Sequence, residues 1–131
     1  MALKSPYLWE DKRILIVEDD ESSSFLLREI LKSTSAELEF SVNGKSAVQF
    51  IREHTDTDMV LMDINLPDMD GITATEMIKG ISGDIVVFAQ SAYTSSLDQQ
   101  KARDAGCDEF IPKPLNPYLL LSKINEYLAE E

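Results

Sequence analysis

The sequence has little cysteine, little positive charge and no long apolar run, and each shortage excludes a class of protein. Cys107 is the only cysteine in 131 residues, which excludes an internal disulfide framework and fits a reducing compartment. Twelve Lys and Arg stand against 24 Asp and Glu, a net charge of −12, so there is no electrostatic footprint for nucleic acid or an anionic membrane. The longest apolar run, residues 85–89, is far below the ~18 residues that span a bilayer. We therefore expect a cytoplasmic protein that binds neither nucleic acid nor membrane directly.

Short apolar segments alternate with helical patterns along the chain. The length fits one domain at ~150 residues per domain, and the hydrophobic fraction of 44% fits a globular core. Five apolar segments recur roughly every 25 residues, a spacing typical of βα units: 14–17, 38–42, 59–62, 85–89 and 109–111. Five such units with right-handed crossovers predict a three-layer α/β/α sandwich. We expect the domain to cover residues 13–131 and residues 1–12 to be an N-terminal tail or linker.

Local patterns refine this prediction. The segments at 14–17, 59–62 and 85–89 are almost wholly apolar, as expected of strands covered on both faces. The segment at 38–42 alternates apolar and polar residues, which indicates an edge strand. Ser22 or Ser23 is the expected N-cap of the first helix.

Acidic residues gather directly after two of the predicted strands. Glu18, Asp19 and Asp20 follow the first strand, and Asp63 follows the third. In an open α/β sheet, ligands bind beyond the carboxyl ends of strands where the strand order reverses. Two carboxylates ~4 Å apart repel by roughly 4 kcal/mol at an effective dielectric of 20. Such a cluster therefore requires a cation, and hard oxygen ligands with room for water suit Mg²⁺.

Two further polar residues follow the fourth and fifth predicted strands. Ser91 comes after the fourth strand, and Lys113 comes after the fifth within Ile111-Pro-Lys-Pro114. An ammonium on a rim of carboxylates can neutralise a bound anion, and a hydroxyl opposite can hydrogen-bond the same anion. Single Ser and Lys residues at strand ends are usually structural or solvated, but their joint placement on this edge favours a site.

Over about residues 12–130 the sequence resembles the receiver domain of two-component response regulators. The matching segments occur in order and at βα spacing: Ile14-Leu-Ile-Val-Glu-Asp-Asp20, Val60-Leu-Met-Asp-Ile-Asn-Leu-Pro-Asp-Met-Asp-Gly71, Ala89-Gln-Ser-Ala92 and Phe110-Ile-Pro-Lys-Pro114. The resemblance implies a flavodoxin-like (βα)5 fold with a parallel five-stranded sheet in the order 2-1-3-4-5. It also implies a cis peptide bond between Lys113 and Pro114, where an X-Pro bond makes the cis form accessible.

The resemblance also assigns roles to the residues at the strand ends. It implies that Asp63 accepts a phosphoryl group from the phosphohistidine of a sensor histidine kinase or phosphotransfer domain. It implies Mg²⁺ ligation by Asp19, the Asp63 carboxylate and the Asn65 backbone carbonyl, with Glu18 acting through water. Lys113 would neutralise the phosphoryl charge and Ser91 would hydrogen-bond a phosphoryl oxygen. The inward movement of Ser91 would be coupled to Phe110, which stands where tyrosine is also common.

The resemblance further implies a signalling domain that catalyses only its own phosphorylation and dephosphorylation. The expected output surface lies on the fourth and fifth α/β units, with Tyr93, Leu97 and Phe110 nearby, and an ordinary amphipathic rim is the other interpretation. This output surface would contact a downstream output domain or protein, and a homodimer through the same surface is left open. The chain ends soon after the fifth predicted helix, so we expect no output domain within it. A stand-alone regulator, a fragment of a longer regulator and the receiver of a hybrid kinase remain open.

Other functions are less well supported. One alternative is a Mg²⁺-dependent phosphatase that forms an aspartyl-phosphate, and a second is a receiver-like interaction domain that works without phosphorylation. No glycine-rich loop follows the first strand, where residues 18–23 read EDDESS, so a dinucleotide site or a P-loop is rejected. Asp63-Ile-Asn65 lacks the second aspartate of haloacid-dehalogenase-like phosphatases. Residues 66–77 place Leu and Met at the first and last positions of an EF-hand loop, which excludes that Ca²⁺ site.

Overall fold

A computed structural model describes residues 6–66, 68–92 and 95–129. Within them, strands and helices alternate along the chain, as the sequence predicts. The elements are β1 (Arg13–Val17), α1 (Glu21–Leu31), the 3-10 helix η1 (Lys32–Thr34), β2 (Glu37–Ser41), α2 (Gly44–Glu53), β3 (Met59–Asp63), α3 (Gly71–Ile81), β4 (Val86–Ser91), α4 (Ser96–Ala105), β5 (Glu109–Pro112) and α5 (Pro117–Leu128). The strands pair in parallel in the order β2-β1-β3-β4-β5, which confirms the predicted flavodoxin-like fold.

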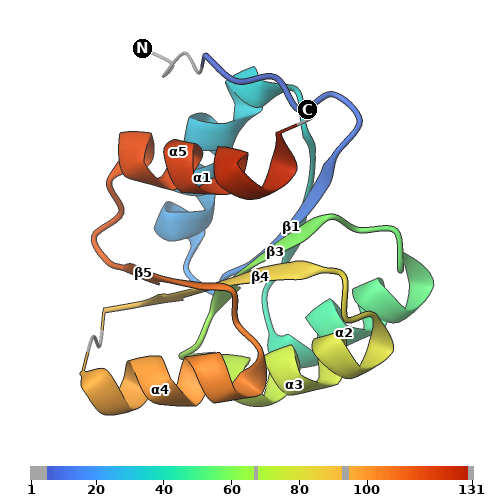
Figure 1. Cartoon of the computed structure of the whole chain (residues 1–131), viewed down its shortest axis with the longest axis vertical. Helices are drawn as coiled ribbons and strands as arrows, with labels where there is room; N and C mark the ends of the chain where they lie inside the picture. The colour runs from blue at the N-terminus through green and yellow to red at the C-terminus, as the bar shows by residue number, and fades with distance from the viewer. Residues whose placement is uncertain (1–5, 67, 93–94, 130–131) are drawn as a thin grey trace.

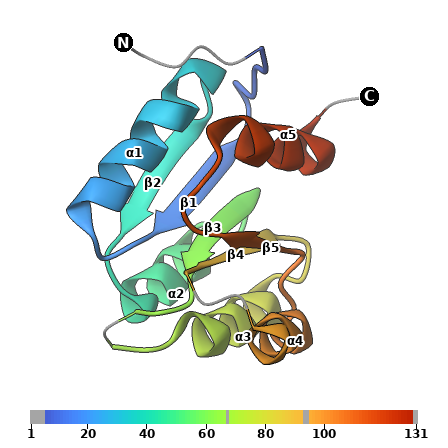
Figure 2. The same cartoon turned by 90° about the vertical axis from the view of Figure 1, so that its left-hand side faces the viewer.

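The sheet is the middle of three layers. Helices α1 and α5 cover one face, and α2, α3 and α4 cover the other (Figures 1 and 2). On the first face, Ile16, Leu61 and Phe88 pack against Leu27 of α1 and Ile124 of α5. On the second face, residues of the same strands pack against α2 and α3. β2 lies at the edge of the sheet, as its alternating sequence predicts.

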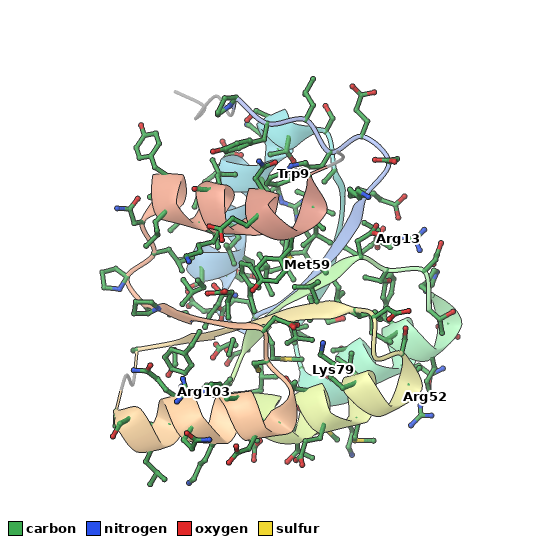
Figure 3. The ribbon with its side chains drawn as sticks, viewed as in Figure 1. Trp9, Arg13, Arg52, Met59, Lys79 and Arg103 are labelled. Atoms are coloured by element: carbon green, nitrogen blue, oxygen red, sulfur yellow. The ribbon has the colours of Figure 1, made fainter. Side chains whose placement is uncertain are left out.

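The segment before β1 contributes to the core. Trp9 is 2% exposed and belongs to the cluster between the sheet and α1 and α5. Its indole Nε1 donates to Oδ1 of Asn125 on α5 at 2.9 Å, and its backbone N donates to the carbonyl of Thr34 at 2.7 Å. Trp9 lies beside the C-terminal half of α5, in the same layer as Met59 of β3 (Figure 3). Within residues 1–12, which we expected to be tail or linker, Trp9 therefore packs against the core, where its large apolar ring fills this layer.

The first helix begins earlier than predicted. The N-cap of α1 is Asp20, whose carboxylate accepts from the backbone N of Ser23 at 2.8 Å and from its hydroxyl at 3.0 Å. Ser22 and Ser23 therefore lie in the first turn, and their prediction as N-cap is wrong. A carboxylate and a serine hydroxyl can both accept from a free N–H at the start of a helix. Only the carboxylate also carries a negative charge, which complements the positive end of the helix dipole.

Candidate functional site

The acidic residues predicted from the sequence meet at one end of the sheet. Glu18 directly follows β1, Asp63 ends β3, and these two strands are neighbours where the strand order reverses. One carboxylate oxygen from each of Glu18, Asp19 and Asp63 lies within 4.8 Å of the others. Glu18 is 2% exposed and Asp63 is 5% exposed, whereas Asp19 is open to solvent. The cluster is therefore a partly buried set of hard oxygen donors with one open side.

Lys113 brings a positive charge to this cluster. The residue follows β5, and its side chain reaches across the sheet so that Nζ donates to Oε1 of Glu18 at 2.9 Å and to Oδ2 of Asp63 at 3.4 Å. Burial opposes the charge of the ammonium, but the hydrogen bond to Glu18 and the nearby carboxylates outweigh it and raise the pKa of Lys113. The ammonium therefore stays charged at neutral pH. The Lys113–Pro114 peptide bond is cis, as predicted.

Glu18 is the most constrained carboxylate of the cluster. Burial, together with the hydrogen bond and charge of Asp63, raises the pKa of Glu18 although Lys113 acts in the opposite direction. Its other oxygen, Oε2, accepts from the backbone N of Asp20 at 3.3 Å. Ionised Glu18 is therefore unfavourable in the folded protein, and a bound divalent cation would relieve that cost.

Asn65 links Asp63 to Ser91. The backbone N of Asn65 donates to Oδ1 of Asp63 at 2.8 Å, so each oxygen of this carboxylate has its own donor. Nδ2 of Asn65 donates to Oγ of Ser91 at 3.3 Å, and Ser91 is fully buried at the end of β4. The structure thus places Ser91 and Lys113 at the same edge as Asp63, as the sequence predicts.

A close approach of two backbone segments fixes the position of Asp63. A Cβ atom at Gly71, the first residue of α3, would lie 2.4 Å from the Asp63 carbonyl oxygen and 2.5 Å from Cα of Ile64. The backbone N of Gly71 also donates to the Ile64 carbonyl at 3.1 Å. The sequence shows Gly71 within a matching segment but gives no sign that α3 begins in contact with the end of β3. Glycine is needed here for close approach of the backbone.

The predicted output surface is only partly within the described residues. Phe110 is half-buried against Ile64, Ala89 and Ala102, beneath α4. Leu97 on α4 is 63% exposed. Tyr93 lies outside the described residues. The structure therefore places Phe110 three residues before Lys113, on the face of the sheet that α4 covers.

A hollow of about 200 Å³ beside Lys113 is a feature that the sequence analysis missed. It is lined by Glu18, Ser23, Leu26, Lys113, Pro114 and Leu115. Phe25 and Leu26, on α1 next to it, are 63% and 45% exposed. The apolar spacing of α1 predicts that Phe25 and Leu26 face the core together with Ile30 and Leu31. Ile30 and Leu31 are buried as predicted, but Leu27 takes the place of Phe25 and Leu26. Exposed aromatic and aliphatic side chains near a polar site are typical of a protein-binding surface.

Neutralising Glu18 should separate its effect on stability from its effect on metal binding. Because folding raises the pKa of Glu18, the protonated form of this carboxyl favours the folded protein. Its contribution to the free energy of unfolding is fully present below the ordinary carboxyl pKa and is lost as pH rises through the folded-state pKa. We therefore expect Glu18→Gln to raise the melting temperature of the metal-free protein at pH 7, with a smaller gain near pH 4.5. The stabilisation by Mg²⁺ should decrease in the same variant. Thermal unfolding with and without Mg²⁺ measures both effects.

Glu76→Gln on the exposed face of α3 is the matched control and should change neither quantity. A metal-free Glu18→Gln protein that is less stable than the parent at pH 7 would show that the Lys113 pair outweighs the burial cost.

Fold and site together define a class of protein: a doubly wound parallel α/β domain with an acidic pocket and one lysine at the switch point of its sheet. Residues 14–125 match the model of the response regulator receiver domain family. The chain belongs to this family of two-component signalling domains. Within the described residues, no helix is long and apolar enough to cross a membrane.

Individual relatives agree with this assignment. The chain is 32% identical over 121 residues to the polar-differentiation response regulator DivK of Brucella anthropi, covering 91% of this chain and 98% of the relative. A CheY-like receiver domain protein of Methanospirillum hungatei superposes with a TM-score of 0.82 at 32% identity, over 89% of this chain and 93% of that one. The receiver domain of Ssk1 from Saccharomyces cerevisiae, in co-crystals with the histidine phosphotransfer protein Ypd1, gives a TM-score of 0.84 at 26% identity. That superposition covers 92% of this chain and 91% of the other.

Proposed function

We propose that the chain is a phosphorylation-controlled receiver whose phosphoacceptor is Asp63. The observation that carries the proposal is the environment of this carboxylate. It is buried, it is held at one oxygen by the backbone N of Asn65, and it faces the Lys113 ammonium at 3.4 Å with its other oxygen. A carboxylate oxygen of Asp63 attacks the phosphorus of a phosphohistidine, the P–N bond breaks, and the electron pair leaves with the imidazole. The product is an acyl phosphate on Asp63.

The acidic cluster fits Mg²⁺ by the chemistry of its donors. Asp19 and Asp63 would be direct carboxylate ligands, the backbone carbonyl of Asn65 a third, and Glu18 would act through water. When bound, the ion supplies neutralisation of the negative charge that spreads over the phosphoryl oxygens. The chain itself supplies the second positive charge through Lys113, and Asn65 keeps the attacking carboxylate oriented.

Ser91 and Phe110 would carry the signal away from the site. Ser91, whose Oγ accepts from Nδ2 of Asn65 in the present structure, donates its hydroxyl to a phosphoryl oxygen once the group is on Asp63. Phe110 pairs in register with Ala89, two residues before Ser91 on β4, so a movement of β4 reaches it directly. The phosphoryl group thereby biases two packings of the α4–β5–α5 face, which binds the downstream protein.

The phosphodonor would be a sensor histidine kinase or a phosphotransfer domain. The donor must cover the open side of the acidic cluster, next to the hollow at Lys113 and the exposed side chains of Phe25 and Leu26. The co-crystal structure of Ypd1 with the receiver domain of Ssk1 shows that a structural relative of this chain forms such an assembly. These apolar side chains would supply the contact that aligns the phosphohistidine with Asp63.

The test is the intact mass of the protein after incubation with acetyl phosphate and Mg²⁺. We expect one labile phosphoryl group on the parent protein and none on Asp63→Ala or in the presence of EDTA. Because the chain modifies only itself, little phosphate should be released from other phosphoesters. Rapid multiple turnover on such esters would favour a phosphatase. No adduct and no change on adding beryllofluoride with Mg²⁺ would favour an interaction domain that works without phosphorylation.

A further inference from the structure

A buried amide without a hydrogen-bond partner lies next to the phosphoacceptor. Gln90 is 0% exposed, and within the described part of the chain neither Nε2 nor Oε1 has a partner. Buried amides are nearly always hydrogen-bonded, so an unpaired one demands a physical reason. The family resemblance gives Gln90 no role, and the mechanism above does not use it.

The sheet places this amide beneath the site. Phe88 packs in the cluster under α1 and α5, whereas Ala89 packs on the opposite face under α4. Because side chains alternate along a strand, Gln90 faces the same side as Phe88. Gln90 pairs in register with Asp63 on β3 and with Ile111 on β5. Ile111 belongs to the cluster under α1 and α5, and Asp63 comes two residues after Leu61 of the same cluster, so both face the same side of the sheet as Gln90. Gln90 is therefore the neighbour of the phosphoacceptor across one strand spacing of about 4.8 Å.

Lys113 must pass over the end of β4 to reach the acidic cluster. It follows β5 by one residue, and its Nζ lies 3.4 Å from Asp63 on β3 and 2.9 Å from Glu18 after β1. β4 lies between β5 and β3, so the lysine side chain crosses the end of β4, whose last residue, Ser91, directly follows Gln90. The ammonium has three N–H donors, and these two carboxylates accept two of them.

We propose that Gln90 is a positioning residue whose amide oxygen becomes an acceptor for Lys113 when Asp63 carries a phosphoryl group. The proposal rests on the proposed function of Asp63. On phosphorylation, the ammonium moves from Oδ2 of Asp63 to a phosphoryl oxygen, and its stem shifts over β4. The neutral amide of Gln90 can then accept a hydrogen bond from the ammonium and orient it. A carboxylate at this position would instead compete with the phosphoryl group for the positive charge of Lys113. The unpaired amide of the resting structure thus gains its partner in the phosphorylated one.

The test compares Gln90→Met with the parent protein, using beryllofluoride and Mg²⁺ as the phosphoryl mimic. Met has a similar volume and no polar atom, so the resting variant should melt about 3 °C higher because no amide is left unpaired. Its affinity for beryllofluoride should be roughly tenfold weaker, because the hydrogen bond to the charged ammonium is lost. A purely structural Gln90 would change the melting temperature and leave the affinity unchanged.

A spectroscopic measurement on the parent protein is independent of the variant's stability. The side-chain ¹⁵N–¹H₂ signals of Gln90 are identified by their absence from the spectrum of Gln90→Met. We expect them to shift on adding beryllofluoride with Mg²⁺, while the same signals of the exposed Gln49 on α2, outside the α4–β5–α5 face, stay in place. Gln49→Met is the matched control and should alter neither stability nor affinity.

The outcomes separate this inference from the function on which it rests. If the parent protein fails to bind beryllofluoride, the proposed function of Asp63 fails. The positioning role is wrong, and the receiver function stands, under a different result. In that case the parent and Gln90→Met bind beryllofluoride equally well, and the Gln90 signals of the parent do not shift.

Discussion

Gly71→Ala is expected to destabilise the protein by about 3 kcal/mol and to lower its melting temperature by about 10 °C. The added Cβ would meet two backbone atoms, the Asp63 carbonyl oxygen at 2.4 Å and Cα of Ile64 at 2.5 Å. Neither atom can rotate away as a side chain does, so β3 and α3 must separate. Because Asp63 ends β3, the same displacement should weaken Mg²⁺ binding. Thermal unfolding with and without Mg²⁺ measures both changes.

Gly80→Ala provides a control on the same helix. A Cβ at Gly80 meets no atom within 4 Å, so alanine should stabilise α3 by about 0.5–1 kcal/mol. If Gly71→Ala were as stable as Gly80→Ala, the contact between α3 and the end of β3 would not fix the phosphoacceptor.

Trp9→Ala is expected to destabilise the protein by about 3–5 kcal/mol, the usual cost of removing a buried tryptophan. The ring is 2% exposed between the sheet and α5, and its loss also leaves Oδ1 of Asn125 without its donor. Chemical denaturation followed by circular dichroism measures the change. Trp9→Phe, which keeps most of the packing but not the N–H, should lose much less.

Leu8→Ala is the matched control, because Leu8 is 66% exposed and should change stability by less than about 0.5 kcal/mol. Equal stability of Trp9→Ala and Leu8→Ala would support the boundary that we expected at residue 13. The predicted loss would instead place the start of the folding unit before Trp9.

The sheet and the edge that carries the site could be predicted because their signals are local. Apolar runs such as 59–62 predict buried strands, and in parallel strands all carboxyl ends meet at one edge. Glu18 and Asp63 therefore come together whatever the details of the loops. Asn116 before Pro117 likewise predicts the start of α5, where the side chain of Asn116 accepts from the backbone N of Leu119.

Features that depend on contacts between distant segments could not be predicted. Trp9 follows Tyr7 and Leu8 in a short segment without periodicity, so only the packing against α5 reveals its burial. Asp20 competes with Ser22 and Ser23 as N-cap, and both residue types are suitable in that position. Gln90 lies within an apolar strand, and its sequence does not indicate that its amide would be left without a partner beside Asp63.

Locating the phosphoryl group is the measurement that tests the central claim most directly. Protein treated with acetyl phosphate and Mg²⁺ is reduced with borohydride, which converts an aspartyl-phosphate into homoserine, and its peptides are then sequenced by mass spectrometry. We predict homoserine at position 63 and at no other aspartate, with none when EDTA is present. Homoserine at Asp19, or a stable phosphate on a serine such as Ser91, would contradict the assignment of Asp63 as the phosphoacceptor.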